Sequence, residues 1–487
     1  MDKPTPSFER IVICGAGLAG QIAATALSKQ LPQSIQITLV DCLSSADTDL
    51  FYGGVTGPLS YDFNLSVGVS EPNLILQSNT VFSYGTRYVA WGGRSWLQCF
   101  QQPLPILDQV MFHHYLTRQK LDQLEPYLIS AMAARNGSFA HPPEQRDHLL
   151  SQAEYGYQFD PRSYASLFEQ AADAGRIERI VAEISGIDRD QNGIAAIRLS
   201  NGQSLTANLY VDCSGPKAVL LSGFGVAFSG RRQLRAMANH RSAEKIGPPC
   251  RTVTAGDFGW QSETPLKGSI ARLTVYAPGT ESSAFAAHGE APSQSAEVTI
   301  GRHEQAWHGN CVAIGHAAAI FEPLTIAPMV MLQRDIERLL SLIPFSNEMS
   351  VERREYNRQH NDDCAHAALF HRALFETQGL PNSPYWNAVR SEPLDEKLNR
   401  KLEMFESRGV LVAYDLEPFN QEDWTILHYG MGRRPLRYDR VVDKALEARI
   451  REHLFNMRRD IEKVVKTMPS HDSYIRNLTR HLMQQKG

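Results

Sequence analysis

A short glycine-rich run near the N-terminus has the residue types and spacing that bind a dinucleotide. The run consists of Gly15, Ala16, Gly17, Leu18, Ala19 and Gly20, and Asp41 follows it. The first glycine permits a tight turn, the second lets the backbone approach a pyrophosphate, and the third lets a helix pack closely on a strand. A carboxylate placed like that of Asp41 accepts hydrogen bonds from a ribose hydroxyl. The chemistry that these residues predict is nucleotide binding.

A strand, a helix and a second strand must hold these residues in place. Arg10–Cys14 is a β-branched run, a helical pattern continues to about Gln30, and Ile35–Val40 is a second apolar run ending at Asp41. The helix would begin at the glycines, so its free N–H groups and its dipole would face the phosphates. We therefore predict a Rossmann-like βαβ unit.

The rest of the chain predicts an α/β fold (α+β, in two domains) with interleaved parts. We expect a nucleotide-binding domain over residues 1–330, substrate-binding segments within it at about 50–150 and 220–300, and a helical C-terminal region over 331–487. Residues 50–102 are rich in Gly, Ser, Tyr and Trp and are expected to be long ordered loops. We expect a helix over Arg162–Asp173 and strands over Arg179–Ile187, Ile194–Leu199, Leu209–Asp212, Ser269–Tyr276 and Ala296–Ile300.

The composition excludes several classes of protein. Hydrophobic residues make up 43% of the 487 residues, which is too high for a disordered chain. The net charge of −4 gives no long-range attraction for nucleic acid or anionic lipid. There is no apolar run of roughly 18 residues to span a membrane and no apolar signal core, so we expect a cytoplasmic protein. The seven cysteines show no metal-binding spacing, so no metal site is predicted.

Separated motifs carry a resemblance to a known family. The most informative is residues 310–333, NCVAIGHAAAIFEPLTIAPMVMLQ, which predicts a buried strand, a glycine turn and a loop that opens a helix. The others include Tyr155–Asp160, Leu209–Gly215, Arg251–Gly256 and Met468–His471. In this order and spacing they resemble the FAD-dependent tryptophan halogenases, over nearly the whole chain.

The resemblance implies the cofactor and its delivery. The nucleotide would be FAD, residues 1–330 would be the FAD-binding domain, and a separate flavin reductase would supply FAD in its reduced form. Gly315, His316 and Met329 would face the flavin. His316 would contact it through its backbone or act through its imidazole, and both alternatives stay open.

The substrate side of the resemblance rests on aromatic residues and one loop. Trp91, Trp260 and Thr325 would lie at the substrate, which in that family is an indole ring. A set of aromatic residues either lines an indole-binding cleft or belongs to the core: Tyr52, Tyr61, Phe63, Trp91 and Trp96.

The chain departs from the family pattern where oxidised halide is handled. The catalytic lysine position is taken by Ser83, and the chain has no lysine between Lys29 and Lys120. The position of the substrate-side glutamate is taken by Thr325. In the halide-binding Ser-Thr-Gly run the last residue is Pro328, which has no N–H to donate. The Trp-x-Trp-x-Ile-Pro motif is reduced to residues 260–265, WQSETP.

These departures favour oxygenation over halogenation. We expect an FAD-dependent monooxygenase that hydroxylates a tryptophan or indole. The target is expected to be a tryptophan of a partner protein, because the chain also resembles flavoproteins that modify tryptophan during cysteine tryptophylquinone formation. A halogenase with relocated catalytic groups, a hydroxylase of a small molecule and a non-catalytic flavoprotein chaperone remain as alternatives.

Overall fold

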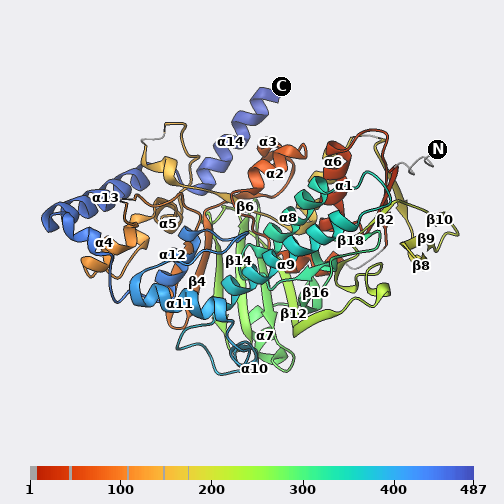
Figure 1. Ribbon diagram of the computed structural model, residues 1–487. Helices are drawn as coiled ribbons and strands as arrows, with labels where there is room; N and C mark the ends of the chain where they lie inside the picture. Colours follow the sequence, from red (N-terminus) through yellow and green to blue (C-terminus); the bar gives the residue numbers. More distant parts are fainter. Residues whose placement is uncertain (1–7, 43–45, 107–108, 146–147, 174, 487) are drawn as a thin grey trace.

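The computed structural model describes residues 8–42, 46–106, 109–145, 148–173 and 175–486. It is a mixed α/β fold in which two sheets stand side by side and the helices of the C-terminal part pack around one of them (Figure 1). Among these residues, no helix is both long and apolar enough to cross a lipid bilayer.

The first sheet carries the N-terminal βαβ unit. Its inner strands Arg10–Cys14 and Leu209–Asp212 are buried on both faces, as their β-branched and apolar residues require. β1 (Arg10–Cys14) lies parallel to β2 and β11, and α1 (Leu18–Gln30) and α6 (Pro161–Ala171) pack on one another at its face. The strand order is β17 (Trp307–His308), β18 (Cys311–Ala313), β11 (Leu209–Asp212), β1, β2 (Gln36–Asp41) and β7 (Ile177–Val181).

The second sheet has eight strands drawn from distant parts of the chain. β4 pairs in parallel with β13, and the other neighbours are antiparallel. The strand order is β19 (Ala319–Ile320), β16 (Gln294–His303), β12 (Phe228–Ser242), β15 (Ser269–Tyr276), β14 (Gly259–Leu266), β13 (Arg251–Gly256), β4 (Gly85–Trp91) and β5 (Arg94–Cys99).

Two small sheets and two short 3-10 helices complete the parts around the site. The ladders are β3 (Val81–Ser83) with β6 (Gly156–Gln158), and β8 (Ile184–Asp190), β9 (Gly193–Leu199) and β10 (Ser204–Leu205). The 3-10 helices are η1 (Ala46–Tyr52) and η6 (Gly315–Ala317).

The chain beyond the second sheet is helical, as predicted. α8 (Ala327–Ser341) begins at the loop that follows β19, and α9 (Ser350–Ala373) packs on it. The remaining helices of this part are α10 (Pro384–Arg390), α11 (Glu396–Arg408), α12 (Gln421–Gly430), α13 (Glu447–Thr467) and α14 (His471–Lys486). Earlier helices are α2 (Ser60–Ser66), α3 (Glu71–Gln77), α4 (Phe112–Arg118), α5 (Ile129–Arg135) and α7 (Glu281–His288).

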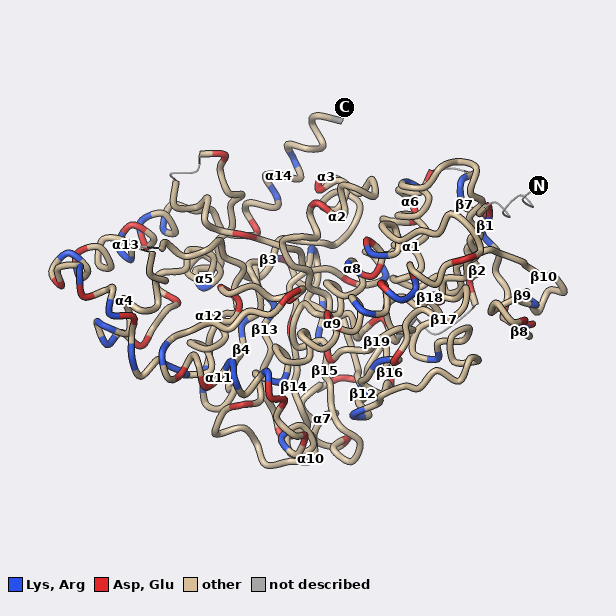
Figure 2. Tube along the Cα trace, viewed as in Figure 1, with Lys and Arg blue, Asp and Glu red and all other residues tan. Residues whose placement is uncertain are grey.

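Two large cores hold the elements together. One surrounds the first sheet and includes the fully buried Ile11, Val12 and Leu18. The other lies between the eight-stranded sheet and the C-terminal helices, where Trp91 and Trp260 are both completely buried. Lys and Arg residues and Asp and Glu residues are interspersed along the described chain (Figure 2).

Several predicted elements are confirmed. The runs Arg10–Cys14, Leu209–Asp212 and Ser269–Tyr276 coincide with β1, β11 and β15. The runs Ile194–Leu199 and Ala296–Ile300 lie inside β9 and β16.

Two expectations for the middle of the chain are wrong. Arg179–Ile187 is two strands in different sheets, because β7 pairs with β2 and ends at Val181, while β8 begins at Ile184 and pairs with β9. Residues 50–102 are not loops, because they contain α2, α3, β3, β4 and β5. The pairing of β4 with β13 is a long-range contact that a local pattern does not reveal.

Candidate cofactor and substrate site

The glycine-rich run forms the tight turn that its sequence predicts. Gly15 has φ +106°, and a Cβ there would lie 2.2 Å from the Cys213 carbonyl oxygen. A Cβ on Gly20 would lie 1.7 Å from the Gly15 carbonyl oxygen. A side chain at either position would therefore collide with backbone, and only glycine fits.

The N-terminus of α1 already holds an anion from the chain itself. The Leu18 N–H donates to Asp49 Oδ2 at 3.0 Å, and a Cβ on Gly17 would meet only that carboxylate, at 3.1 Å. Ala16 and Ala19 add no bulk, so backbone can come close here. The carboxylate stands in for a phosphate oxygen. The residues at this end therefore fit the pyrophosphate of a dinucleotide.

Asp41 ends β2 beside the glycine-rich turn. Its strand is parallel to β1, and the Gly15 N–H donates to the Val40 carbonyl next to it. This is the edge of the sheet where a ribose would lie. Ribose binding by Asp41 stays a prediction.

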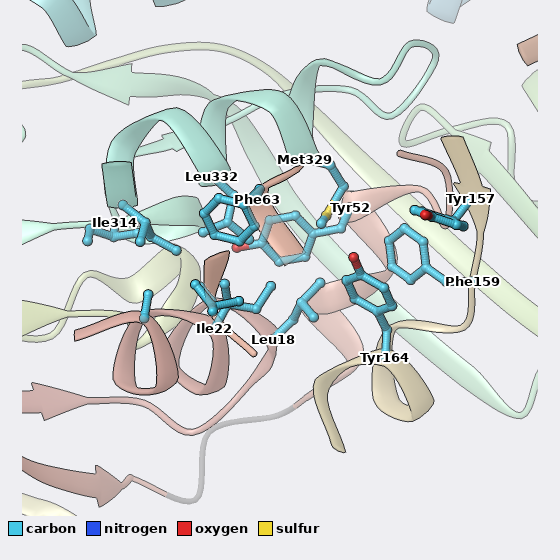
Figure 3. Close-up of a cluster of buried hydrophobic side chains, with 14 of the residues drawn as sticks. Leu18, Ile22, Tyr52, Phe63, Tyr157, Phe159, Tyr164, Ile314, Met329 and Leu332 are labelled. Atoms are coloured by element: carbon cyan, nitrogen blue, oxygen red, sulfur yellow. The ribbon is translucent and has the colours of Figure 1, made fainter. Parts of the chain in front are cut away.

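The loop after β18 brings Gly315 and His316 against Tyr52. The His316 and Tyr52 rings stack with centroids 3.9 Å apart, and the His316 N–H donates to the Tyr52 hydroxyl at 3.3 Å. Burial lowers the pKa of His316 to about 3, so its imidazole is neutral at ordinary pH. Met329, in the first turn of α8, is completely buried near the same ring (Figure 3). A cavity of only about 10 Å³ remains between Tyr52, Gly315, His316 and α8.

The loop between β19 and α8 is held by buried charges. Arg251 is completely buried and donates to the carbonyl oxygens of Gly53 (3.0 Å), Pro323 (2.8 Å) and Leu324 (2.6 Å). The Tyr88 hydroxyl also donates to the Leu324 carbonyl, at 2.7 Å. Burial lowers the pKa of Arg251 to about 10, which leaves the guanidinium charged at neutral pH.

A second buried charge fixes the start of this loop. Glu322 accepts hydrogen bonds from Trp260 Nε1 at 2.7 Å and Arg232 Nη2 at 2.8 Å, and from the Tyr385 hydroxyl. Burial raises the pKa of Glu322, but the Arg232 charge and the other donors more than offset this and hold it below its usual range. The carboxylate is therefore ionised and anchors the loop.

The hydroxyl of Thr325 is engaged by its own loop. Thr325 Oγ1 accepts the Ala327 N–H at 3.2 Å, and Pro328 follows without an N–H. Two of the backbone positions at the start of α8 therefore offer no donor to an anion.

Ser83 is completely buried in β3. Its hydroxyl donates to the Gly85 carbonyl and accepts the Gly85 N–H, both at 3.2 Å. β3 pairs with β6, where a Cβ on Gly156 would lie 2.2 Å from the Thr56 carbonyl oxygen. One residue on, a Cβ on Gly57 would lie 2.7 Å from Ile326 Cδ1. The segment 53–57 thus runs between β6 and the Thr325 loop.

The structure places the two predicted substrate tryptophans in the second core. Trp91 donates from Nε1 to the Leu374 carbonyl at 2.6 Å and meets the Trp386 ring edge-on at 5.0 Å. The indole N–H of Trp260 donates to the Glu322 carboxylate. Contact of either indole with substrate stays a prediction. Within the aromatic set, Tyr52, Phe63, Trp91 and Trp96 are buried, and Tyr61 is 42% exposed.

The sequence analysis did not identify three candidate functional residues: Asp49, Arg251 and Glu322. Arg251 and Glu322 lie within the motifs 251–256 and 310–333, but a sequence does not show whether a charged residue is buried or exposed. In the sequence, the adjacent Gly53 and Gly54 indicate a segment that can pass close to other backbone. In the structure both have positive φ. Among the described residues no group of three or more His, Cys, Asp or Glu side chains can hold a metal ion.

Comparisons with known proteins match nearly the whole chain and its fold. The family model described as tryptophan halogenase matches residues 10–447. Tryptophan 7-halogenase KtzQ of Kutzneria sp. (strain 744) is 25% identical over 96% of this chain and 98% of its own. The structure of BrvH, a flavin-dependent halogenase from Brevundimonas sp. BAL3, is 25% identical, covers 97% of this chain and 99% of its own, and has a TM-score of 0.89.

A more distant structure shares the fold. MibH, described as a lathipeptide tryptophan 5-halogenase, is 19% identical, covers 99% of this chain and 95% of its own, and has a TM-score of 0.81. Flavin-dependent halogenases use FAD, which a separate reductase supplies in reduced form.

Proposed function

The chain belongs to the tryptophan halogenase family, and we propose that it is a monooxygenase that hydroxylates a tryptophan or indole ring without a halide. The observation that carries this proposal is the state of the two hydroxyls at the lysine and glutamate positions. Ser83 and Thr325 are both buried, and each is bonded to backbone of its own segment.

A lysine relay has no replacement at these positions. A serine hydroxyl carries no positive charge and cannot form a chloramine. No lysine occurs between Lys29 and Lys120. Of the two described buried cations at the Glu322–Pro328 loop, Arg251 is engaged by three carbonyls and Arg232 by Glu322. Hypohalous acid would therefore meet no amine at the positions of Ser83 and Thr325.

The halide side has lost donors as well. The Ala327 N–H is taken by Thr325, and Pro328 has no N–H. Binding of a desolvated halide ion needs several donors, because a buried anion without partners is strongly unfavourable. This loop supports oxygen transfer better than halide oxidation.

The reaction needs one cofactor and one external electron donor. Reduced FAD supplies the activation of O₂ when it is bound. In the overall reaction one oxygen atom replaces a ring hydrogen as hydroxyl, the other leaves as water, and a flavin reductase provides the electrons through FAD. Gly17 and Leu18 at the N-terminus of α1 would hold the pyrophosphate, and Trp260 and Arg251 keep the loop of Glu322–Pro328 in place.

We further propose that the target is a tryptophan residue of a partner protein, as in cysteine tryptophylquinone formation. Leu59, Tyr61 and Leu65 of α2 and its N-cap are 67%, 42% and 54% exposed, directly after the 53–57 segment that lines the loop. Exposed apolar side chains beside a site favour a protein partner. The name of MibH records a peptide substrate on the same fold.

Halogenation is the second candidate. The relatives that match nearly the whole chain, KtzQ among them, are named as tryptophan halogenases. If catalytic groups have moved to other positions, an indole or other aromatic small molecule would be halogenated.

Turnover in halide-free buffer tests the proposal. Protein, FAD, a flavin reductase and NADH are mixed with free tryptophan, indole or a tryptophan-bearing partner protein, with and without bromide. Hydroxylated product should form without halide at an unchanged rate. A product that forms only with bromide contradicts the proposal, and turnover of free indole alone contradicts the protein substrate.

A further inference from the structure

One short segment, η1, reaches both ends of the expected FAD site. It spans Ala46–Tyr52 and joins β2 to the 53–57 segment. Asp49 lies at the N-terminus of α1, and Tyr52 lies at the loop of Gly315 and His316. These are the two places where the glycine-rich turn and the family resemblance locate the cofactor.

At the pyrophosphate end, Asp49 makes the contact that a phosphate oxygen would make. Its Oδ2 accepts the Leu18 N–H at 3.0 Å, and it is also the nearest group to the Gly17 Cα face. Burial raises the pKa of Asp49 to about 6, so the carboxylate is charged at neutral pH even in this shielded place. Two negative groups cannot share these donors, because their repulsion in a shielded site is strong.

At the ring end, Tyr52 fills the space. Its ring lies among Leu18, Phe63, Met329 and Leu332 (Figure 3) and stacks on His316. The remaining cavity of about 10 Å³ holds no more than one water molecule. The hydroxyl lies so near Gly315 that a Cβ there would be 2.4 Å away.

We propose that η1 is an internal competitor for FAD: Asp49 and Tyr52 occupy positions that FAD needs, and FAD binds by displacing them together. The inference rests on FAD being the cofactor of the proposed function, but not on which reaction follows. Displacement exposes the buried Tyr52 ring and moves the carboxylate from its donor, and both effects weaken FAD binding.

Removal of the Asp49 charge tests the pyrophosphate end. Asp49→Asn and Asp49→Ala should bind oxidised FAD about five- to thirty-fold more tightly than the native chain, measured by quenching of flavin fluorescence. Asp62→Asn is the matched control, because it removes the same charge from an exposed position of α2. Its dissociation constant should equal that of the native chain.

Removal of the Tyr52 ring tests the other end. Tyr52→Val should tighten FAD binding relative to Tyr52→Phe, which keeps the ring and loses only the hydroxyl. Amide hydrogen exchange of residues 46–52 in the native chain should speed up when FAD is added. Because Tyr52 belongs to the core, circular dichroism is used to check that each Tyr52 variant folds. If Tyr52→Val does not fold, the FAD affinity of the isosteric Asp49→Asn variant tests the proposal.

Unchanged or weaker FAD binding in Asp49→Asn, or exchange of residues 46–52 that FAD leaves unchanged, overturns the inference. No binding of FAD by any variant overturns it too. These titrations contain neither O₂ chemistry, substrate nor halide. A halogenated product would therefore overturn the proposed function and leave this inference standing.

Discussion

At the scale of single residues, the loop of Glu322–Pro328 is held by two buried charges, Arg251 and Glu322. The Arg251 guanidinium donates hydrogen bonds to three backbone carbonyls in two segments, Gly53 and Pro323–Leu324. A buried cation without a carboxylate partner is unfavourable in itself, and what Arg251 contributes is the fixed position of these three carbonyls. Arg251 is thus a positioning residue for the loop.

Replacing Arg251 tests this role. Arg251→Met should lower the free energy of unfolding by about 3 kcal/mol, because it leaves three buried carbonyls without a donor. Arg251→Lys keeps the charge but not the fork of donors and should recover only part of the loss. Urea unfolding measures both. Equal stability of Arg251→Met and the native chain would show that the carbonyls are satisfied in another way.

The buried Asp49 gives the cofactor-free chain a specific pH dependence. Its pKa is raised from 3.8 to about 6 by burial, so the folded chain binds the proton more tightly than the unfolded chain. Its contribution to stability therefore falls as pH rises from about 4 to about 6 and is constant above, a loss of about 3 kcal/mol. In Asp49→Asn this loss should vanish from the difference curve measured by thermal or urea unfolding. A difference curve that is flat over this window contradicts the assignment.

At the scale of elements, the glycine-rich turn separates folding from cofactor binding. Gly20 faces the Gly15 carbonyl at a distance that no Cβ tolerates, whereas Gly17 faces only the Asp49 carboxylate. The fold therefore requires glycine at position 20. At position 17, glycine instead leaves room for a group that binds at the N-terminus of α1.

Two alanine variants check this division. Gly17→Ala should fold with native stability and lose FAD affinity by about ten-fold or more, because its methyl group lies where the pyrophosphate approaches. Gly20→Ala should lose several kcal/mol of stability, on the order of a severe core defect. Unfolding curves and FAD titrations give the two readouts. Unchanged FAD affinity in a folded Gly17→Ala would mean that the nucleotide does not lie at this turn.

The same elements show what the sequence predicts well. β1, β11 and β15 were predicted to the residue, because each is a compact apolar run that a buried strand requires. β4 was missed because its hairpin with β5 has a register shift after Tyr88, with positive φ at Ala90, Gly92 and Gly93. That irregularity removes the simple alternation of a strand and leaves a composition typical of loops.

The site divides in the same way. Gly15, Gly17 and Gly20 were predictable, because their geometry is a local property of the turn. Asp49 and Arg251 could not be predicted, because their roles depend on contacts between segments that are distant in the sequence. Departures at Ser83, Thr325 and Pro328 were visible, but only the structure adds that the two hydroxyls are engaged and that the Ala327 N–H is taken.

At the scale of the whole molecule, the chain keeps the architecture of its family although residues at the positions expected to handle halide differ. The fold matches BrvH over 97% of the chain with a TM-score of 0.89 at 25% identity. Substitutions at the positions that would handle halide leave the two sheets and the helical part in place. The family scaffold is thus compatible with an oxidant that is delivered to substrate without a halide.

The origin of the atom added to the ring tests this claim most directly. The chain is given FAD, a flavin reductase, a tryptophan substrate, bromide and isotopically labelled O₂, and the product is analysed by mass spectrometry. Our account predicts one labelled oxygen atom on the ring, no bromine, and a yield that does not depend on bromide. A brominated product without labelled oxygen, in a yield that rises with bromide, would contradict it.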